Sequence, residues 1–333
     1  MHTPNRRQPS KPALAEPAKM AELWAKKYLG SLESRNQSWS NRFEVKPRVM
    51  IVKRLVSELR TASAKAWHLT ESMLAYEVQR HGIDATLIDP WEVSKDVHTV
   101  YTKSLTAYSQ EISPQRLSVK ISTALGKLRQ RYTAVDPRLI GFVSMQFHYC
   151  GKILIDKAPG TERALLMSYF KVIDDHLYMP LQRAYDAAAQ YTYRDERLAV
   201  VQALLPHITT IAKNVVNRVN QLYPSYCSYT DRLSSAAVRI SSIRDVEMFQ
   251  VYLWTCVLER RFDSIQEELF PLCVMLYPTL KVNWELVRQM LHLLAREFKA
   301  YVTHEQMLLY APYQDALWEM FSPNIFPDII ELE

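Results

Sequence analysis

The chain has 333 residues, of which 48% are hydrophobic and 23% are charged, and this balance excludes a disordered protein. It contains only 6 glycines, about a quarter of an average supply, so it lacks the material for the turns and bulges of a sheet protein. The net charge is +6. The sequence contains no run of about 20 uncharged apolar residues, so we expect no transmembrane segment.

Apolar residues recur at helical spacing through most of the chain, and the predicted elements follow in order. A short amphipathic helix is expected at 19–32, and a long one from Pro47 toward Gly82, where the glycine suits a helix end. Residues 83–91 form an extended connector. Further helices are predicted at 93–111, 114–132, 137–157, 161–190, 194–222, 243–260, 263–277, 283–303 and 305–321. Pro180 should kink or split one of these helices, and Pro206 lies inside another.

This pattern predicts an all-α protein, either a multi-helix bundle or a short α-solenoid, with a disordered basic N-terminal arm. The arm covers 1–17, where four prolines stand among polar residues. A basic N-terminal helical domain should follow over 18–158, and a C-terminal helical domain over 159–333. The boundary rests on the Ala-Pro-Gly-Thr loop at 158–161.

Charge is distributed unevenly between the two ends of the chain. Residues 1–65 carry 14 Lys/Arg and 5 Asp/Glu, whereas the remaining residues carry 27 and 30. A basic head on a mildly acidic body suggests an anionic partner, which could be nucleic acid, lipid or an acidic protein face. The alternative is a solvated tail that keeps the protein in solution.

No motif in the sequence identifies a reaction, a cofactor or a metal. The phosphate-binding glycine loops, the Gly-x-Ser-x-Gly elbow and the His-Glu-x-x-His zinc pattern are all missing. Asp174, Asp175 and His176 are adjacent, but neighbours on a helix point about 100° apart and cannot converge as a triad. Cys150, in an apolar helix, is expected in the core. We therefore expect no catalytic residue, no metal ligand and no cofactor.

The four cysteines are far apart and form no Cys-x-x-Cys pair, which favours free thiols and a cytoplasmic location. The most apolar helix should bury its aromatic and aliphatic residues Phe249, Val251, Trp254 and Leu258.

The segment 116–131 is the best candidate for binding an anionic partner. It contains no acid, and its apolar residues Leu117, Ile121, Leu125 and Leu128 share one helix face. The opposite face should be basic and exposed, with the candidate binding residues Arg116, Lys120, Lys127, Arg129 and Arg131. The simpler interpretation is a solvated helix face.

Tyrosine clusters that we interpret as loop-like form a second candidate surface, because aromatic residues in loops often anchor a partner. The candidates are Tyr223, Tyr226, Tyr229, Tyr310 and Tyr313. The alternative is that they fill gaps between helices.

Two segments, YFKVIDDHLYMPLQRAYDAAA at 169–189 and ISSIRDVEMFQVYLWTCVLE at 240–259, resemble an uncharacterised all-helical protein family of cyanobacteria. The resemblance implies a cytoplasmic bacterial protein with no assigned chemistry. Our first hypothesis is a non-enzymatic adaptor or regulator that acts through protein–protein surfaces. The second is a nucleic-acid-associated regulator that uses the basic arm and helix 116–131. The third is a ligand carrier or enzyme with a pocket between helices. The oligomeric state is left open.

Overall fold

The computed structural model describes residues 16–29, 48–192 and 194–327. Over these residues the chain forms helices and turns, with an isolated β-bridge between Cys227 and Arg232 and no strand. The predicted all-α class is therefore confirmed. Most of the predicted arm, 1–15, lies outside the described residues. Helix α1 (Glu16–Ala25) begins earlier than expected and includes the last two residues that we had assigned to the arm.

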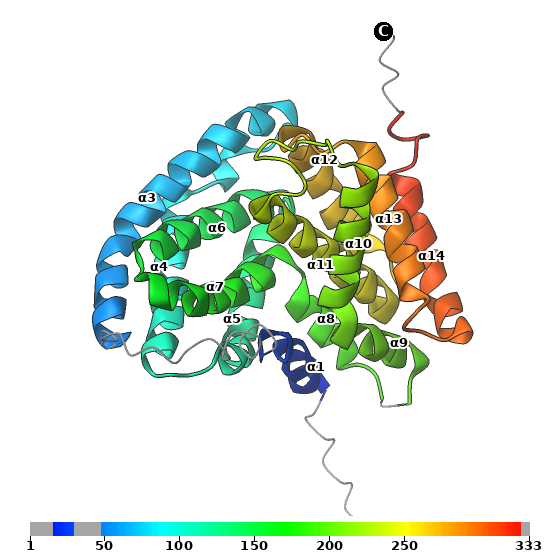
Figure 1. Ribbon diagram of the computed structural model, residues 1–333, viewed down its shortest axis with the longest axis horizontal. Helices are drawn as coiled ribbons and strands as arrows, with labels where there is room; N and C mark the ends of the chain where they lie inside the picture. The colour runs from blue at the N-terminus through cyan, green and yellow to red at the C-terminus, as the bar shows by residue number, and fades with distance from the viewer. Residues whose placement is uncertain (1–15, 30–47, 193, 328–333) are drawn as a thin grey trace, which may run out of the picture.

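The first half of the described chain forms a layer of long helices. Helix α3 (Arg48–Arg80) runs along one edge of the molecule and packs against α4 and α6 (Figure 1). Gly82 ends it with a φ of 59°, and the Ile83 N–H donates to the Val78 carbonyl at 2.9 Å. The helices that follow are α4 (Pro90–Ser109), α5 (Pro114–Thr133), α6 (Leu139–Lys157) and α7 (Gly160–Tyr178).

Proline divides the middle of the chain as predicted. Pro180 separates α7 from α8 (Leu181–Ala188), and Pro206 lies in a 3₁₀ turn between α9 (Glu196–Leu204) and α10 (Ile208–Leu222). The remaining helices are α11 (Ala236–Glu259), α12 (Phe270–Thr279), α13 (Trp284–Phe298) and α14 (His304–Met320), with a π-helical turn at Ser264–Leu269 before α12.

Helix α11 is the central element of the second half. Every residue from Val246 to Leu258 is buried, which includes the four positions that the sequence assigned to the core. The predicted start at residue 243 was wrong, because the Ser235 side chain accepts from the Val238 N–H and caps the helix about two turns earlier.

A continuous hydrophobic core joins residues on both sides of the expected boundary at 158–161. Helix α7, which follows this loop, packs against α4, α5 and α6, all of which precede it. The loop itself is a tight connection between two neighbouring antiparallel helices. Helix α7 therefore packs against helices that precede the loop as well as against α8, which follows it.

Candidate functional site

Helix α1 and the short helical segment at 27–29 that follows it present three side chains to the rest of the protein on one face. Trp24, Lys27 and Tyr28 are three and four residues apart, so they project together. Trp24 and Tyr28 are buried, and the Trp24 ring meets Trp254 of α11 edge-on at 6.5 Å between centroids. The Trp24 indole N–H donates to the Tyr28 hydroxyl at 3.1 Å. Helix α1 also packs against α5 and α8, as Figure 1 shows.

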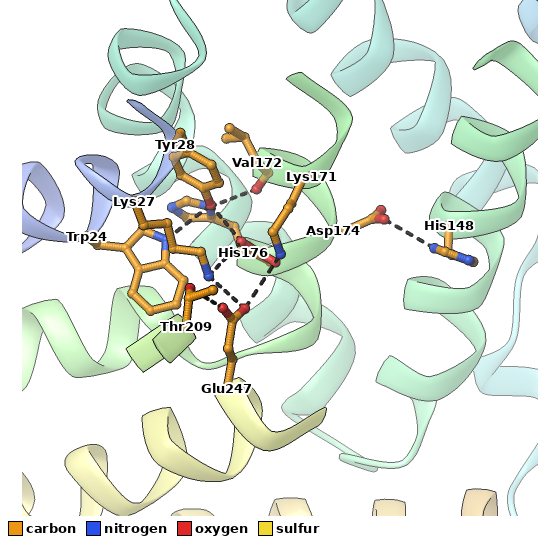
Figure 2. Close-up of polar contacts among 11 residues, drawn as sticks. Trp24, Lys27, Tyr28, His148, Lys171, Val172, Asp174, His176, Thr209 and Glu247 are labelled. Atoms are coloured by element: carbon orange, nitrogen blue, oxygen red, sulfur yellow. Dashed lines mark hydrogen bonds and ion pairs between the residues drawn. The ribbon is translucent and has the colours of Figure 1, made fainter. Parts of the chain in front are cut away.

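Beneath α1 lies a network of two lysines and two carboxylates, which we call the α1 clamp: Lys27, Lys171, Asp175 and Glu247. The Lys27 Nζ lies 2.7 Å from Glu247 Oε2 and 3.3 Å from Asp175 Oδ2. The Lys171 Nζ lies 2.9 Å from Asp175 Oδ1 and 3.5 Å from Glu247 Oε2. Figure 2 shows both ammonium groups pointing at the same carboxylate pair.

Two hydroxyl groups complete the α1 clamp. Tyr28 donates to Asp175 Oδ2 at 2.8 Å, and Thr209 of α10 donates to Glu247 Oε1 at 2.5 Å. The network therefore joins α1, α7, α10 and α11. Its two positive and two negative charges balance, which is the condition under which buried ions are tolerated.

The protonation of the α1 clamp follows from this balance. Burial alone would raise the pKa of Asp175, but Lys171, Lys27 and the hydrogen bonds outweigh it and hold this pKa well below its usual value. Burial would likewise raise the pKa of Glu247, and the same two lysines lower it. Both carboxylates are therefore ionised at neutral pH.

The three adjacent residues 174–176 diverge, as their helical spacing predicts. Asp175 points into the α1 clamp, whereas Asp174 lies 3.2 Å from Nδ1 of His148 on α6 (Figure 2). His176 is buried against the Tyr185 ring, and its Nδ1 donates to the Val172 carbonyl at 2.8 Å. Burial lowers the pKa of His176 to about 4, so its ring is neutral at pH 7.

Sequence reasoning missed the α1 clamp because its members come from four helices. One signal was available: Glu247 is the only charged residue between 246 and 258, and a charge within an otherwise apolar helix needs a partner. Nothing in the local sequence identified Lys27 as that partner.

The basic face of α5 is divided by the structure. Arg116, Lys120 and Lys127 are exposed, and none of them forms an ion pair with the described part of the chain. Arg131 is exposed but pairs with Asp96 of α4. These four cations lie on a different face of α5 from Leu117, Ile121 and Leu125, which are buried as expected.

Arg129 does not belong to this exposed face. Arg129 is only 5% exposed, and its guanidinium forms a buried ion pair with Glu268. It also donates to the Tyr252 hydroxyl at 2.8 Å and to the Leu177 carbonyl at 3.0 Å. The expectation that all five cations are exposed is wrong for Arg129, because its position on the helix points it into the core.

The tyrosines do not form one aromatic surface. Tyr310 is buried, and both Tyr310 and Tyr313 lie inside α14 rather than in a loop. The Tyr223 hydroxyl donates to Glu285 in the first turn of α13, and that of Tyr226 donates to the Lys281 carbonyl in the turn before α13. Both tyrosines therefore fasten the end of α10 and the loop after it to this region. Tyr229 alone among the five is highly exposed, at 59%.

The described residues form neither a reactive cysteine at Cys150 nor a metal site. Cys150 is buried as expected, and burial raises the pKa of its thiol to about 12, which makes it a poor nucleophile. Among residues 16–29, 48–192 and 194–327, no three His, Cys, Asp or Glu side chains are grouped so that they could hold a metal ion.

One described helical stretch, Glu196–Leu222, is long and apolar enough by composition to cross a membrane. Half of its most apolar window is buried within the protein, and the 3₁₀ turn at Leu205–His207 interrupts it. A core helix passes the same test, so this stretch is weak evidence for a span.

No protein-family model, curated protein or solved structure matches the chain. The resemblance of 169–189 and 240–259 to a cyanobacterial family therefore stays a prediction.

Proposed function

We propose that this protein is a non-enzymatic helical adaptor that binds an acidic face of a partner protein along α5. The observation that supports this most directly is the exposed stripe of Arg116, Lys120 and Lys127, which has no acidic partner in the described chain. A cationic stripe without internal partners is available to an anionic surface.

The three cations are arranged as a compact row. At 100° per residue they fall within about 40° of one another around the α5 axis, and they span about 16 Å along it. The opposite side of the helix is fixed by apolar packing and by the buried pair between Arg129 and Glu268. The row is thus held on a rigid support, which lowers the entropy lost on binding.

The α1 clamp supports the non-enzymatic part of the proposal. Acid–base catalysis needs a titratable group that can reach a substrate. Asp175 and Glu247 are buried, and each is saturated by two ammonium groups and a hydroxyl. Such a cluster is suited to fixing the position of α1.

The number of unpaired cations in the α5 row favours a protein over nucleic acid as its partner. Three phosphate contacts would give a salt slope of about 3, whereas strong DNA-binding proteins neutralise 6–10 phosphates. The basic residues Arg6, Arg7 and Lys11 of the arm lie outside the described residues and could add to this number.

The test compares a fluorescent glutamate-rich peptide with random-sequence duplex DNA over a range of salt concentrations. The triple variant Arg116→Gln, Lys120→Gln, Lys127→Gln should bind the peptide about tenfold more weakly, as expected for three exposed ion pairs. A matched control removes three exposed cations of α3 and α4 instead, through Lys53→Gln, Lys65→Gln and Lys103→Gln.

Equal losses in the two triple variants would show that the peptide responds only to net charge, and the α5 proposal would fail. If the wild-type protein binds DNA more tightly than the peptide, with a salt slope well above 3, the nucleic-acid function replaces the adaptor function.

A further inference from the structure

The exposed face of α14 has the opposite charge to the basic row of α5. The residues of α14, 304–320, include three acids and no lysine or arginine, whereas residues 116–131 of α5 include no acid. The acids of α14 are Glu305, Asp315 and Glu319, and all three are exposed. None of them forms an ion pair with the described part of the chain, although Glu319 accepts two hydrogen bonds at 3.4 Å from the turn that follows α14.

The same face of α14 also exposes apolar side chains between its acids. Leu308 is 62% exposed, and Pro312, one turn further along, is exposed as well. At 100° per residue, these two residues and the three acids fall within about 80° of one another around the helix axis. The opposite side of α14 is held in the core by Tyr310 and Leu317, which are buried. The acidic face is therefore presented on a fixed helix.

The spacing of the acids on α14 matches the spacing of the cations on α5 when the two helices run antiparallel. The acids lie at about 0, 6 and 21 Å along α14, counted from Glu319, and the cations at about 0, 6 and 16 Å along α5, counted from Arg116. The difference of about 5 Å at the third pair, Lys127 and Glu305, is within the reach of a flexible lysine stem. A parallel arrangement would bring only two of the three cations opposite an acid.

The intervals between the charges are complementary in size. Between its second and third cations, the exposed side of α5 carries Thr123 and Ala124, whose side chains are small. In the antiparallel arrangement, Pro312 and Leu308 of α14 face this interval. The larger side chains of one helix therefore meet small side chains of the other, which allows two helices to pack closely.

The two faces are far apart within one molecule. Figure 1 places α14 along the right edge of the molecule and α5 in its lower centre, with α8 and α9 between them in this view. The acidic face of one molecule is therefore available to the basic row of another.

We propose that the acidic partner of α5 is α14 of a second copy of this chain, packed antiparallel to it. The expected ion pairs are Arg116 with Glu319, Lys120 with Asp315, and Lys127 with Glu305. This inference rests on the binding function proposed for α5 and names its partner. Because the contact joins two different faces, the copies form a closed ring of two or more molecules or an open chain.

The first experiment is sedimentation velocity of the full chain from about 1 μM to about 1 mM, because a contact of two helices is small and its association should be weak. We expect the weight-average sedimentation coefficient to rise with concentration at low salt. High salt should reduce this association, since it screens exposed charge pairs.

The second experiment removes the acids of α14. The triple variant Glu305→Gln, Asp315→Asn, Glu319→Gln should weaken self-association about tenfold, as expected for three exposed ion pairs. A matched control removes the same charge from exposed acids elsewhere on the surface, through Glu71→Gln, Asp156→Asn and Glu267→Gln. The control should change the association constant less than about twofold.

An exchange of charges tests whether the two faces meet each other. Reversing the row of α5 alone, through Arg116→Glu, Lys120→Glu and Lys127→Glu, should abolish association, because like charges then face each other. Reversing α14 alone, through Glu305→Lys, Asp315→Lys and Glu319→Lys, should do the same. A chain that carries both reversals has the wild-type net charge and should associate to within about tenfold of the wild type. All six positions are exposed, so these variants should fold, and circular dichroism verifies it.

The register is tested by single exchanges. Lys120→Glu combined with Asp315→Lys should restore the association that Lys120→Glu loses, because these residues are opposite each other in the antiparallel contact. Lys120→Glu combined with Glu305→Lys should not restore it. Equal recovery in the two double variants would contradict the proposed register.

A last pair of variants tests the apolar part of the contact. Leu308→Ala should weaken association about fivefold, because part of the leucine surface is buried between the two helices. Ile240→Ala is the control, since Ile240 is also 62% exposed but lies at the start of α11. Equal effects of the two variants would remove Leu308 from the interface.

The proposal is overturned if the chain stays monomeric up to about 1 mM at low salt. It is also overturned if the α14 triple variant and its control associate equally, or if the double reversal does not restore association. A monomeric chain that still binds the glutamate-rich peptide along α5 would keep the adaptor function and assign the acidic face to a different protein. A chain that neither self-associates nor binds the peptide would overturn both proposals.

Discussion

Lys27 and Glu247 are 220 residues apart in the chain, and their side chains meet at 2.7 Å. Lys27 lies two residues after the end of α1, and Glu247 belongs to the buried part of α11. This pair, with Lys171 and Asp175, fastens the first described helix to the core. The contact makes α1 part of the folded protein. The sequence alone predicts only an amphipathic helix beside a polar arm.

Removing Lys27 should destabilise the protein strongly. Lys27→Met leaves two buried carboxylates facing Lys171 alone, and the free energy of unfolding should fall by about 3–5 kcal/mol. The measurement is urea denaturation followed by circular dichroism. Lys26→Met is the matched control, because Lys26 is the exposed neighbour just after α1, and it should change stability by less than about 0.5 kcal/mol.

The loss should be partly restored by removing the second charge. Adding Glu247→Gln to Lys27→Met leaves the balanced pair of Lys171 and Asp175. The double variant should therefore lose at least about 1 kcal/mol less than the sum of the two single variants. Additive losses would mean that Lys27 and Glu247 are not coupled.

His176 should make stability depend on pH between about 6.5 and 4. Because burial lowers its pKa to about 4, the unfolded chain binds a proton in this range and the folded protein does not. The stabilising contribution is complete above pH 6.5 and is lost as the pH falls toward 4, by about 3 kcal/mol in all.

Chemical denaturation at several pH values measures this contribution. His176→Gln should flatten the slope of stability against pH over this interval, whatever its effect on stability at pH 7. His68→Gln, at an exposed position on α3, should leave the slope of the wild type. A wild-type slope that persists in His176→Gln would assign the pH dependence to other groups.

Two tryptophans should respond in opposite ways to truncation. Trp254 is fully buried in α11, so Trp254→Ala should lower the free energy of unfolding by about 3–5 kcal/mol. Trp91 is 82% exposed at the start of α4, and Trp91→Ala should change stability by less than about 0.5 kcal/mol. A small effect at Trp254 in a denaturation experiment would contradict its place in the core.

The two cations Lys127 and Arg129 offer the same contrast within one helix turn. Arg129→Gln leaves Glu268 buried without its partner, and stability should fall by about 3–5 kcal/mol. Lys127→Gln removes an exposed charge with no ion pair in the described chain and should be close to neutral. Thermal unfolding of the two variants, compared with the wild type, should show a large loss of stability for Arg129→Gln and almost none for Lys127→Gln.

The sequence by itself determined the fold class and most helix positions, because glycine scarcity, helical periodicity and proline act locally. Pro180 and Pro206 each interrupt a helix, since proline has no backbone N–H to donate to the preceding turn. Burial of Trp254 followed in the same way from the apolar character of its helix on all sides. The early start of α11 depended on a cap, Ser235, which lies in a loop without a strong local pattern.

Only the tertiary structure decided which charges are free and which are paired. Arg129 and Lys127 are both basic residues in the same acid-free segment of the sequence. They lie about 200° apart around the α5 axis, so Arg129 contacts Glu268 and Lys127 is exposed to water. The partner of Lys27 is likewise set by the packing of α1 on α11. Charge pairing depends on the three-dimensional distance between side chains and on local burial, and neither quantity is contained in the spacing of residues along one helix.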